Sequence, residues 1–108
     1  MLRSIISSNQ IDELFRNGRR YANPYLVLLV APSKTNGSRV LIVAGKKLGG
    51  AVTRNRLKRV LRESVRMAGG PWEGCQVAVI ARQPLKKIGA HRATAELSGL
   101  LRNARLIR

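Results

Sequence analysis

Positive side chains are concentrated in one part of this chain, between residues 46 and 66. Eight Lys or Arg residues and a single acidic residue fall in that segment, which therefore carries a formal charge of +7. Arg54, Lys58 and Arg62 recur at intervals of four residues, so on a helix they share one side. Arginine presents a planar fork that can bind a phosphate through two hydrogen bonds. The charge of this segment and the spacing of its cations predict a phosphate-binding surface, with Arg54, Asn55, Lys58, Arg59, Arg62 and Arg66 on one side of the helix.

A glycine-containing loop leads into the expected helix. Gly45, Gly49 and Gly50 would let the backbone approach phosphates closely, and the first turn of a helix offers further unpaired N–H donors. An ordinary surface helix with a solvated basic side is the alternative explanation for the charge. The opposite side of the helix is apolar and is expected to anchor it to a core through Leu57, Val60, Leu61 and Met67.

The chain lacks the residue sets that commonly carry catalysis or bind metal ions. His91 is the only histidine, and at the expected start of a helix it is more often a cap or surface residue than a general base. The five acidic residues are scattered, without the spacing of a carboxylate pair or a two-metal site. Cys75 is the only cysteine, so it has no partner for a disulfide or a zinc site. We therefore expect no catalytic side chain, no metal ligand and no cofactor bound by the protein itself.

Length and charge indicate the class of protein. A chain of 108 residues is the size of one compact domain, so residues 1–108 are expected to form a single domain. The net charge of +16 repels itself unless a polyanion neutralises it, and nucleic acid is the usual polyanion. A membrane surface is disfavoured because the charge is not confined to one amphipathic helix with aromatic anchors. No segment is apolar enough for a signal peptide or a transmembrane helix, which predicts a cytoplasmic protein.

Apolar periodicity and turn residues predict helices that alternate with short strands. Asn36-Gly37 is typical of a hairpin turn, so the strands on either side of it are expected to pair. Such an order suggests a single sheet covered on one face by helices. The expected elements are a helix ending at Gly18, strands Tyr25–Val30 and Arg39–Ala44, the basic helix ending near Gly69, strand Cys75–Ala81, and a helix marked by Leu97, Leu100, Leu101 and Ala104.

Three segments of the chain match a known pattern in the same order. Residues 45–63 read Gly-Lys-Lys-Leu-Gly-Gly-Ala-Val-Thr-Arg-Asn-Arg-Leu-Lys-Arg-Val-Leu-Arg-Glu. Upstream lie Phe15-Arg16-Asn17-Gly18 and Ala22-Asn23, and downstream lies Val79-Ile80-Ala81-Arg82-Gln83-Pro84. Together these segments resemble the protein component of bacterial ribonuclease P, in its signature basic region, its first helix and its last strand.

This resemblance implies a fold and a division of labour. The fold would be an α/β (α+β) two-layer sandwich with about four strands in a mixed sheet, three helices and a left-handed βαβ crossover, against the general right-handed preference. In that family a catalytic RNA removes the 5′ leader from precursor tRNA using Mg²⁺, while the protein binds this RNA and the leader and raises substrate and metal affinity. One protein would bind each catalytic RNA. A small basic ribosomal protein is the alternative function, because it would share the size and the charge.

The resemblance also implies which residues contact each RNA. Relatives often carry aromatic residues where this chain has Ile11 and Leu29, which leaves Phe15 as the main candidate for stacking on unpaired bases. A core position in an amphipathic helix is the alternative role for Phe15. The catalytic RNA would be bound by Lys46, Lys47, Arg54, Asn55, Arg56, Lys58, Arg59, Arg62 and Arg66, and the leader by Phe15, Val27, Leu29 and Arg82.

Overall fold

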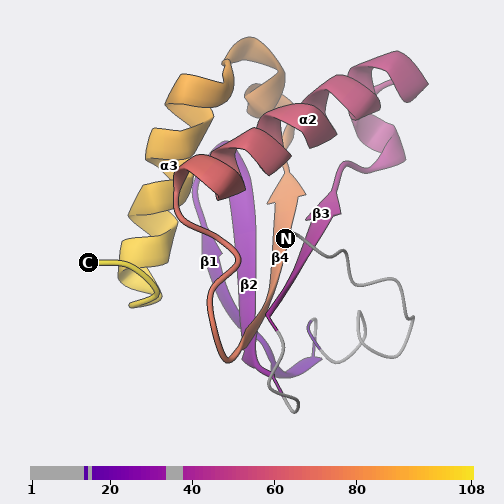
Figure 1. Ribbon diagram of the computed structural model, residues 1–108. Coiled ribbons are helices and arrows are strands. Elements are labelled where there is room, and N and C mark those ends of the chain that lie inside the picture. The colour runs from indigo at the N-terminus through magenta and orange to yellow at the C-terminus, as the bar shows by residue number, and fades with distance from the viewer. Residues whose placement is uncertain (1–13, 15, 34–37) are drawn as a thin grey trace.

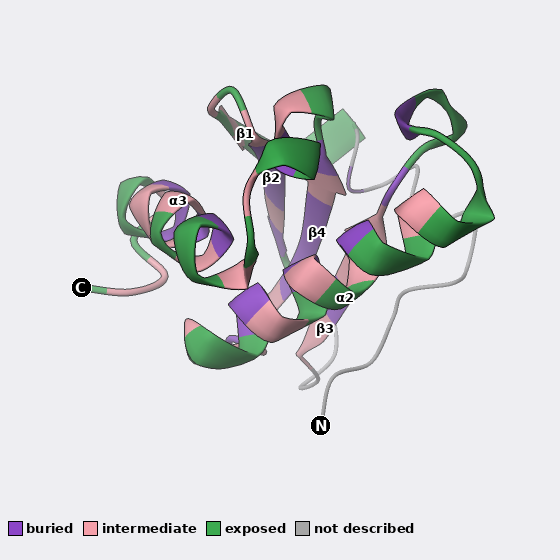
Figure 2. Ribbon diagram, turned by 90° about the horizontal axis from the view of Figure 1, so that it is seen from above, coloured by how far each residue is buried: buried purple, intermediate pink, exposed green. Residues whose placement is uncertain are grey.

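A computed structural model describes residues 14, 16–33 and 38–108, and in these residues two helices pack on one sheet (Figure 1). Both helices lie on the same side of the sheet, so the described chain forms two layers (Figures 1 and 2). Two short 3-10 helices, η1 and η2, occur in the connections. The elements in chain order are β1 (Arg19–Ala22), β2 (Leu26–Pro32), β3 (Arg39–Val43), η1 (Lys46–Leu48), α2 (Ala51–Met67), β4 (Cys75–Ala81), η2 (Gln83–Lys87) and α3 (Ala90–Asn103).

The four strands form a mixed sheet in the order β1-β2-β4-β3. Strand β2 is antiparallel to both β1 and β4, whereas β3 and β4 are parallel and are connected through α2. Strand β4 is interior because its sequence is apolar almost throughout, and the four residues from Gln76 to Val79 are all buried. The predicted α+β class and the mixed four-stranded sheet are thereby confirmed.

The prediction that the strands flanking Asn36-Gly37 pair as a hairpin was wrong. Strands β2 and β3 are not neighbours, because β4 lies between them and pairs with both. At the end of β2, Ser33 donates its N–H to the carbonyl of Gly74 at 2.8 Å, so the chain leaves β2 beside the start of β4. A buried strand needs hydrogen-bonding partners on both edges, which β4 obtains only inside the sheet. Residues 34–37 lie outside the described residues.

Strand β1 was not predicted, and the first helix is described only at its end. The sequence of β1 contains one large apolar residue, Tyr21, and so shows no alternation. Leu14, Arg16 and Asn17 are helical and Gly18 follows them, while the rest of the expected helix lies outside the described residues. The described residues thus contain two of the three predicted helices as complete elements. Neither of the two is long and apolar enough to cross a membrane.

The main core lies between the sheet and the two helices. Leu57, Leu61 and Val65 of α2 are fully buried, as the apolar periodicity predicted, and they pack with inward residues of β2, β4 and α3 (Figure 2). Full burial of one such side chain contributes about 1.5–3 kcal/mol to stability. Met67, which was expected on the same side, is 48% exposed because it is the last residue of α2. The buried stripe fixes which side of α2 faces outward.

Candidate nucleic-acid interface

Helix α2 begins directly after a loop whose backbone requires glycine at one position. Gly49 has a φ of +139°, which residues with a side chain rarely adopt, and a Cβ there would lie 3.2 Å from the Cβ of Thr53. Gly50 caps α2 in an extended conformation, and no side chain accepts the N–H groups of the first turn. A Cβ at Gly45 or Gly50 would meet nothing within 4 Å. Of the three glycines in this loop, only Gly49 has a backbone conformation that requires glycine.

Predicted phosphate-binding residues lie along the side of α2 that faces away from the core. Arg59 and Arg62 are exposed, and Arg54 and Lys58 are half-buried. None of these four side chains donates a hydrogen bond to a described residue, and the Nε of Arg54 is buried without an acceptor. Asn55 is exposed beside them. Apart from the buried Nε of Arg54, the donors of these side chains therefore remain available to an external anion.

Two arginines of the predicted surface are already engaged within the protein. Arg56 donates from Nη2 to the backbone carbonyl of Lys86 at 2.9 Å. Arg66 donates from Nε to Glu63 at 3.2 Å and makes a second contact with the other carboxylate oxygen through Nη2. The hydrogen bond from Arg66 holds the pKa of Glu63 below its ordinary value, and the same bond raises the pKa of Arg66. Arg56 and Arg66 are therefore not among the side chains whose donors are unpaired. The surface that can bind an external anion contains fewer cations than the sequence alone indicates.

Segment η2 holds the basic loop in place, which the sequence did not predict. Gln83 donates from Nε2 to the carbonyl of Lys47 at 2.6 Å, and Lys86 donates from Nζ to the carbonyl of Leu48 at 2.9 Å. The residues joined in this way are 36 and 38 positions apart in the chain. No local pattern signals such contacts, because they depend on the pairing of β3 with β4.

A hollow of about 830 Å³ opens where β3 and β4 end. Lys46 and Lys47 line it from η1, and Arg82 lines it from the residue after β4. Arg82 also donates from Nη1 to the carbonyl of Asn23 at 3.0 Å, which holds its side chain across the end of the sheet. The structure thus brings together cations that were assigned to two different RNA ligands. The complete lining consists of Val43, Gly45, Lys46, Lys47, Leu48, Ile80, Ala81, Arg82 and Gln83.

Two of the residues predicted to bind the leader are buried beneath the sheet. Val27 and Leu29 share the face of β2 opposite the two helices, and they are only 8% and 3% exposed. They pack in a small cluster with Leu14 and Ala78. Val27 also pairs with Ile80, which lines the hollow. Phe15 lies outside the described residues, and the roles of all three in leader binding stay predictions.

His91 and Cys75, the only histidine and the only cysteine of the chain, both lie among the described residues. No group of three or more His, Cys, Asp or Glu side chains among them could hold a metal ion. His91 is exposed in the first turn of α3. Burial raises the pKa of the Cys75 thiol, which disfavours the reactive thiolate. The exposed cations Arg59 and Arg62 of α2, whose donors are unpaired, are suited to binding anions.

Comparison with known proteins places the chain among proteins of one kind. The family model described as Ribonuclease P matches residues 2–105. The ribonuclease P protein component of Natranaerobius thermophilus is 35% identical over 99 residues, which cover 91% of this chain and 86% of that protein. The RNase P protein of Staphylococcus aureus has a similar structure, with a TM-score of 0.85, 28% identity and coverage of 97% of both chains. For the RNase P protein of Thermotoga maritima the TM-score is 0.80 and the identity 29%, over 94% of this chain and 96% of that one.

Proposed function

Because this chain belongs to the bacterial ribonuclease P protein family, we propose that its basic surface binds the catalytic RNA and the substrate side by side. It is the protein component of ribonuclease P, the endoribonuclease that processes the 5′ ends of tRNA precursors. Membership of this family rules out the alternative that the chain is a small ribosomal protein. The catalytic RNA contacts the outward side of α2, and the 5′ leader enters the hollow.

The observation that carries this proposal is the hollow that Lys46, Lys47 and Arg82 share. Its lining includes Lys46–Leu48 of η1, which precede α2 in the chain, and we propose that the outward cations of α2 extend the binding surface from there. A leader that passes Arg82 would have its backbone within reach of Lys46, while the RNA bound along α2 lies beside it. We therefore propose that Lys46 and Lys47 contact both RNAs, and that Val27, Leu29 and Phe15 support the leader from below the sheet.

The protein contributes binding and electrostatics, and the RNA contributes the chemistry. Mg²⁺ would be held by RNA phosphates, because the described residues offer no cluster of metal ligands. Cations that neutralise phosphates let two RNAs approach each other and allow metal ions to bind where repulsion would otherwise dominate. We propose one protein for each catalytic RNA, and a cytoplasmic location for the complex.

We also propose that the connection from β3 through α2 to β4 is left-handed. Support comes from Figure 1, where α2 lies in front of the sheet, both strands point upward and β4 is to the left of β3. The general preference is for the right-handed connection. The crossover connection would then have the unusual left-handed sense that the family resemblance implies.

A probe attached to the first turn of α2 tests this arrangement. Val52 is 85% exposed, so Val52→Cys in a Cys75→Ser background can carry an iron chelate that generates hydroxyl radicals without disturbing the core. We expect strand cleavage both in the catalytic RNA and in the 5′ leader of bound precursor tRNA. Glu73→Cys, in the exposed loop before β4, is the matched control and should cut the leader weakly or not at all. Cleavage of neither RNA from position 52 would refute the proposal.

A further inference from the structure

Helix α3 ends in a turn that places Arg105 in the left-handed conformation. Its φ is +61°, and it is the only residue other than glycine with a positive φ among those the structure describes. The N–H of Arg105 donates to the carbonyl of Arg102, and the N–H of Leu106 donates to that of Leu101, each at 3.0 Å. These two bonds define the Schellman motif, in which glycine usually occupies the position of Arg105. A Cβ makes this conformation unfavourable.

Helix α2 ends in the same motif with glycine. Gly69 has a φ of +94° and donates its N–H to the carbonyl of Arg66 at 3.1 Å. Gly70 donates to the carbonyl of Val65 at 2.9 Å. The two helix ends therefore share their hydrogen bonds but differ in the residue at the strained position. At the end of α3 the chain carries an arginine where glycine would fit without strain.

Contacts within the described protein do not explain this arginine. Arg105 is exposed and, like Arg102 and Arg108, its side chain donates no hydrogen bond to a described residue. Glu96 is the only acidic residue of α3, and it already pairs with Arg92 at 3.1 Å. A strained residue without internal compensation points to a role outside the folded chain.

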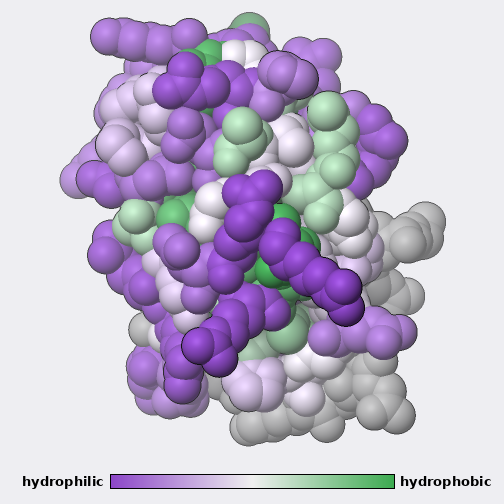
Figure 3. Space-filling view, turned by 90° about the vertical axis from the view of Figure 1, so that its left-hand side faces the viewer, coloured by the Kyte–Doolittle hydropathy of each residue, from purple (hydrophilic) through white to green (hydrophobic). Residues whose placement is uncertain are grey.

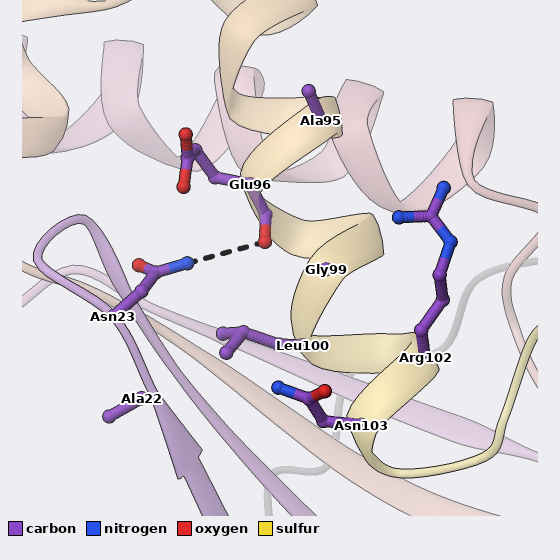
Figure 4. A pocket seen from close by; sticks show the side chains of 8 residues that line it. All are labelled: Ala22, Asn23, Ala95, Glu96, Gly99, Leu100, Arg102 and Asn103. Atoms are coloured by element: carbon purple, nitrogen blue, oxygen red, sulfur yellow. Dashed lines mark hydrogen bonds between the residues drawn. The ribbon is translucent and has the colours of Figure 1, made fainter.

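The C-terminal end of α3 lies on the left-hand side of the molecule in Figure 1, and the space-filling view of that side shows many hydrophilic residues (Figure 3). A hollow of about 450 Å³ lies between α3 and the end of β1. The amide of Asn23 in this hollow is occupied, because it donates to the carbonyl of Glu96 and accepts the N–H groups of Tyr25 and Leu26. Figure 4 shows the guanidinium of Arg102 extending from α3 away from Asn23. The unexplained feature is thus the set of outward arginines and not the hollow.

We propose that Arg102, Arg105 and Arg108 form a second phosphate-binding surface for the catalytic RNA. Three guanidinium groups within seven residues supply forks suited to backbone phosphates. Helix α3 has 14 residues, so this surface lies about 21 Å along the helix from η2, which borders the first hollow. The protein therefore holds two segments of one folded RNA. This inference rests on the RNA-binding function proposed above.

Stabilisation of the helix is the competing explanation for these charges. Positive side chains near the C-terminus of a helix interact favourably with its dipole. Arg102, in the last turn of α3, provides that effect in an ordinary helical conformation. The dipole does not require a side chain at the left-handed position, where glycine would serve better. The substitution Arg105→Gly therefore separates the two explanations.

We expect Arg105→Gly to leave the melting temperature unchanged or higher, since glycine adopts the left-handed conformation without steric cost. Its affinity for a bacterial ribonuclease P RNA should fall about fourfold to fivefold at about 0.15 M salt, with a log–log salt slope shallower by about 0.7–0.9. Arg92→Gln is the matched control. It removes one charge from the same helix, but from a guanidinium already held by Glu96 and the ring of Tyr25.

Wild-type affinity and slope for Arg105→Gly would overturn the second surface, and the proposed function would stand if substitutions on α2 still weakened binding. The proposal would also be overturned if Arg105→Gly and Arg92→Gln weakened RNA binding equally. Such a result would show an effect of net charge and not of a binding surface at the end of α3. If Arg105→Gly did not fold, the double variant Arg102→Gln, Arg108→Gln would test the second surface instead, because it leaves Arg105 and its left-handed conformation unchanged. Its salt slope should be shallower by about 1.5, and an unchanged slope would overturn the proposal.

Discussion

Replacing Arg59 and Arg62 together by Ala should weaken the complex with the catalytic RNA about 15- to 30-fold at about 0.15 M salt, and should make the log–log salt dependence shallower by about 1.5. Both side chains are exposed on α2, and neither donates a hydrogen bond to a described residue. The substitutions are therefore expected to remove the proposed phosphate contacts without removing hydrogen bonds between described residues. The measurement is an RNA titration at several salt concentrations, with melting curves of both proteins to show that folding is unchanged.

Arg66→Ala is the matched control for this double variant. It removes an arginine from the same helix, but one that Glu63 already holds, so the loss of affinity should be much smaller. Glu63→Gln acts in the opposite direction, because it releases Arg66 and removes the only acidic residue of α2, and RNA binding should tighten. A loss for Arg66→Ala as large as that for Arg59→Ala alone would refute the distinction between paired and unpaired arginines.

Replacing Lys46 and Arg82 together by Ala should weaken precursor tRNA binding to the assembled complex about 15-fold at about 0.15 M salt, the effect expected from the loss of two contacts to a single strand. Both residues line the hollow in which we place the leader. Mature tRNA has no leader, so the loss of Arg82 should hardly change its affinity. The loss of Lys46 should change that affinity only if Lys46 also contacts the catalytic RNA. Titration of both tRNAs against the same assembled complex measures the difference.

Lys87→Ala provides the comparison for the hollow. Lys87 is an exposed cation of η2 that does not line the hollow, so its loss removes one positive charge from a neighbouring position, against two in the double variant. We expect precursor and mature tRNA to be affected equally and weakly by this substitution. If Lys87→Ala reduced the preference for precursor tRNA as much as the double variant does, general charge and not the hollow would guide the leader.

Helix α2 was predictable from the sequence because its information is local. The same 3.6-residue period that placed Leu57 and Leu61 in the core placed Arg59 and Arg62 on the outside. The pairing of Glu63 with Arg66 was not predicted, although residues three apart are neighbours on a helix. Strand β4 was recognisable because a continuous apolar run indicates a strand buried on both faces.

Strand order and long-range contacts were not predictable, because they depend on the whole fold. The sequence on either side of Asn36-Gly37 reads as a hairpin, yet β4 inserts between the two strands and removes the expected pairing. The contact of Arg56 with the carbonyl of Lys86 spans 30 positions and reduces the part that Arg56 can take in phosphate binding. The hollow likewise exists only because β3 and β4 are parallel neighbours, which brings Lys46 next to Arg82.

Reconstitution of 5′ processing tests the central claim most directly. The purified protein, a bacterial ribonuclease P RNA and precursor tRNA are combined at a Mg²⁺ concentration too low for the RNA to work alone. We predict correct removal of the 5′ leader with the wild-type protein, reduced cleavage with the Arg59→Ala, Arg62→Ala variant, and no cleavage by the protein without the RNA. Cleavage by the protein alone, or no stimulation of any cognate RNA by the folded wild-type protein, would contradict the claim that this surface docks a catalytic RNA.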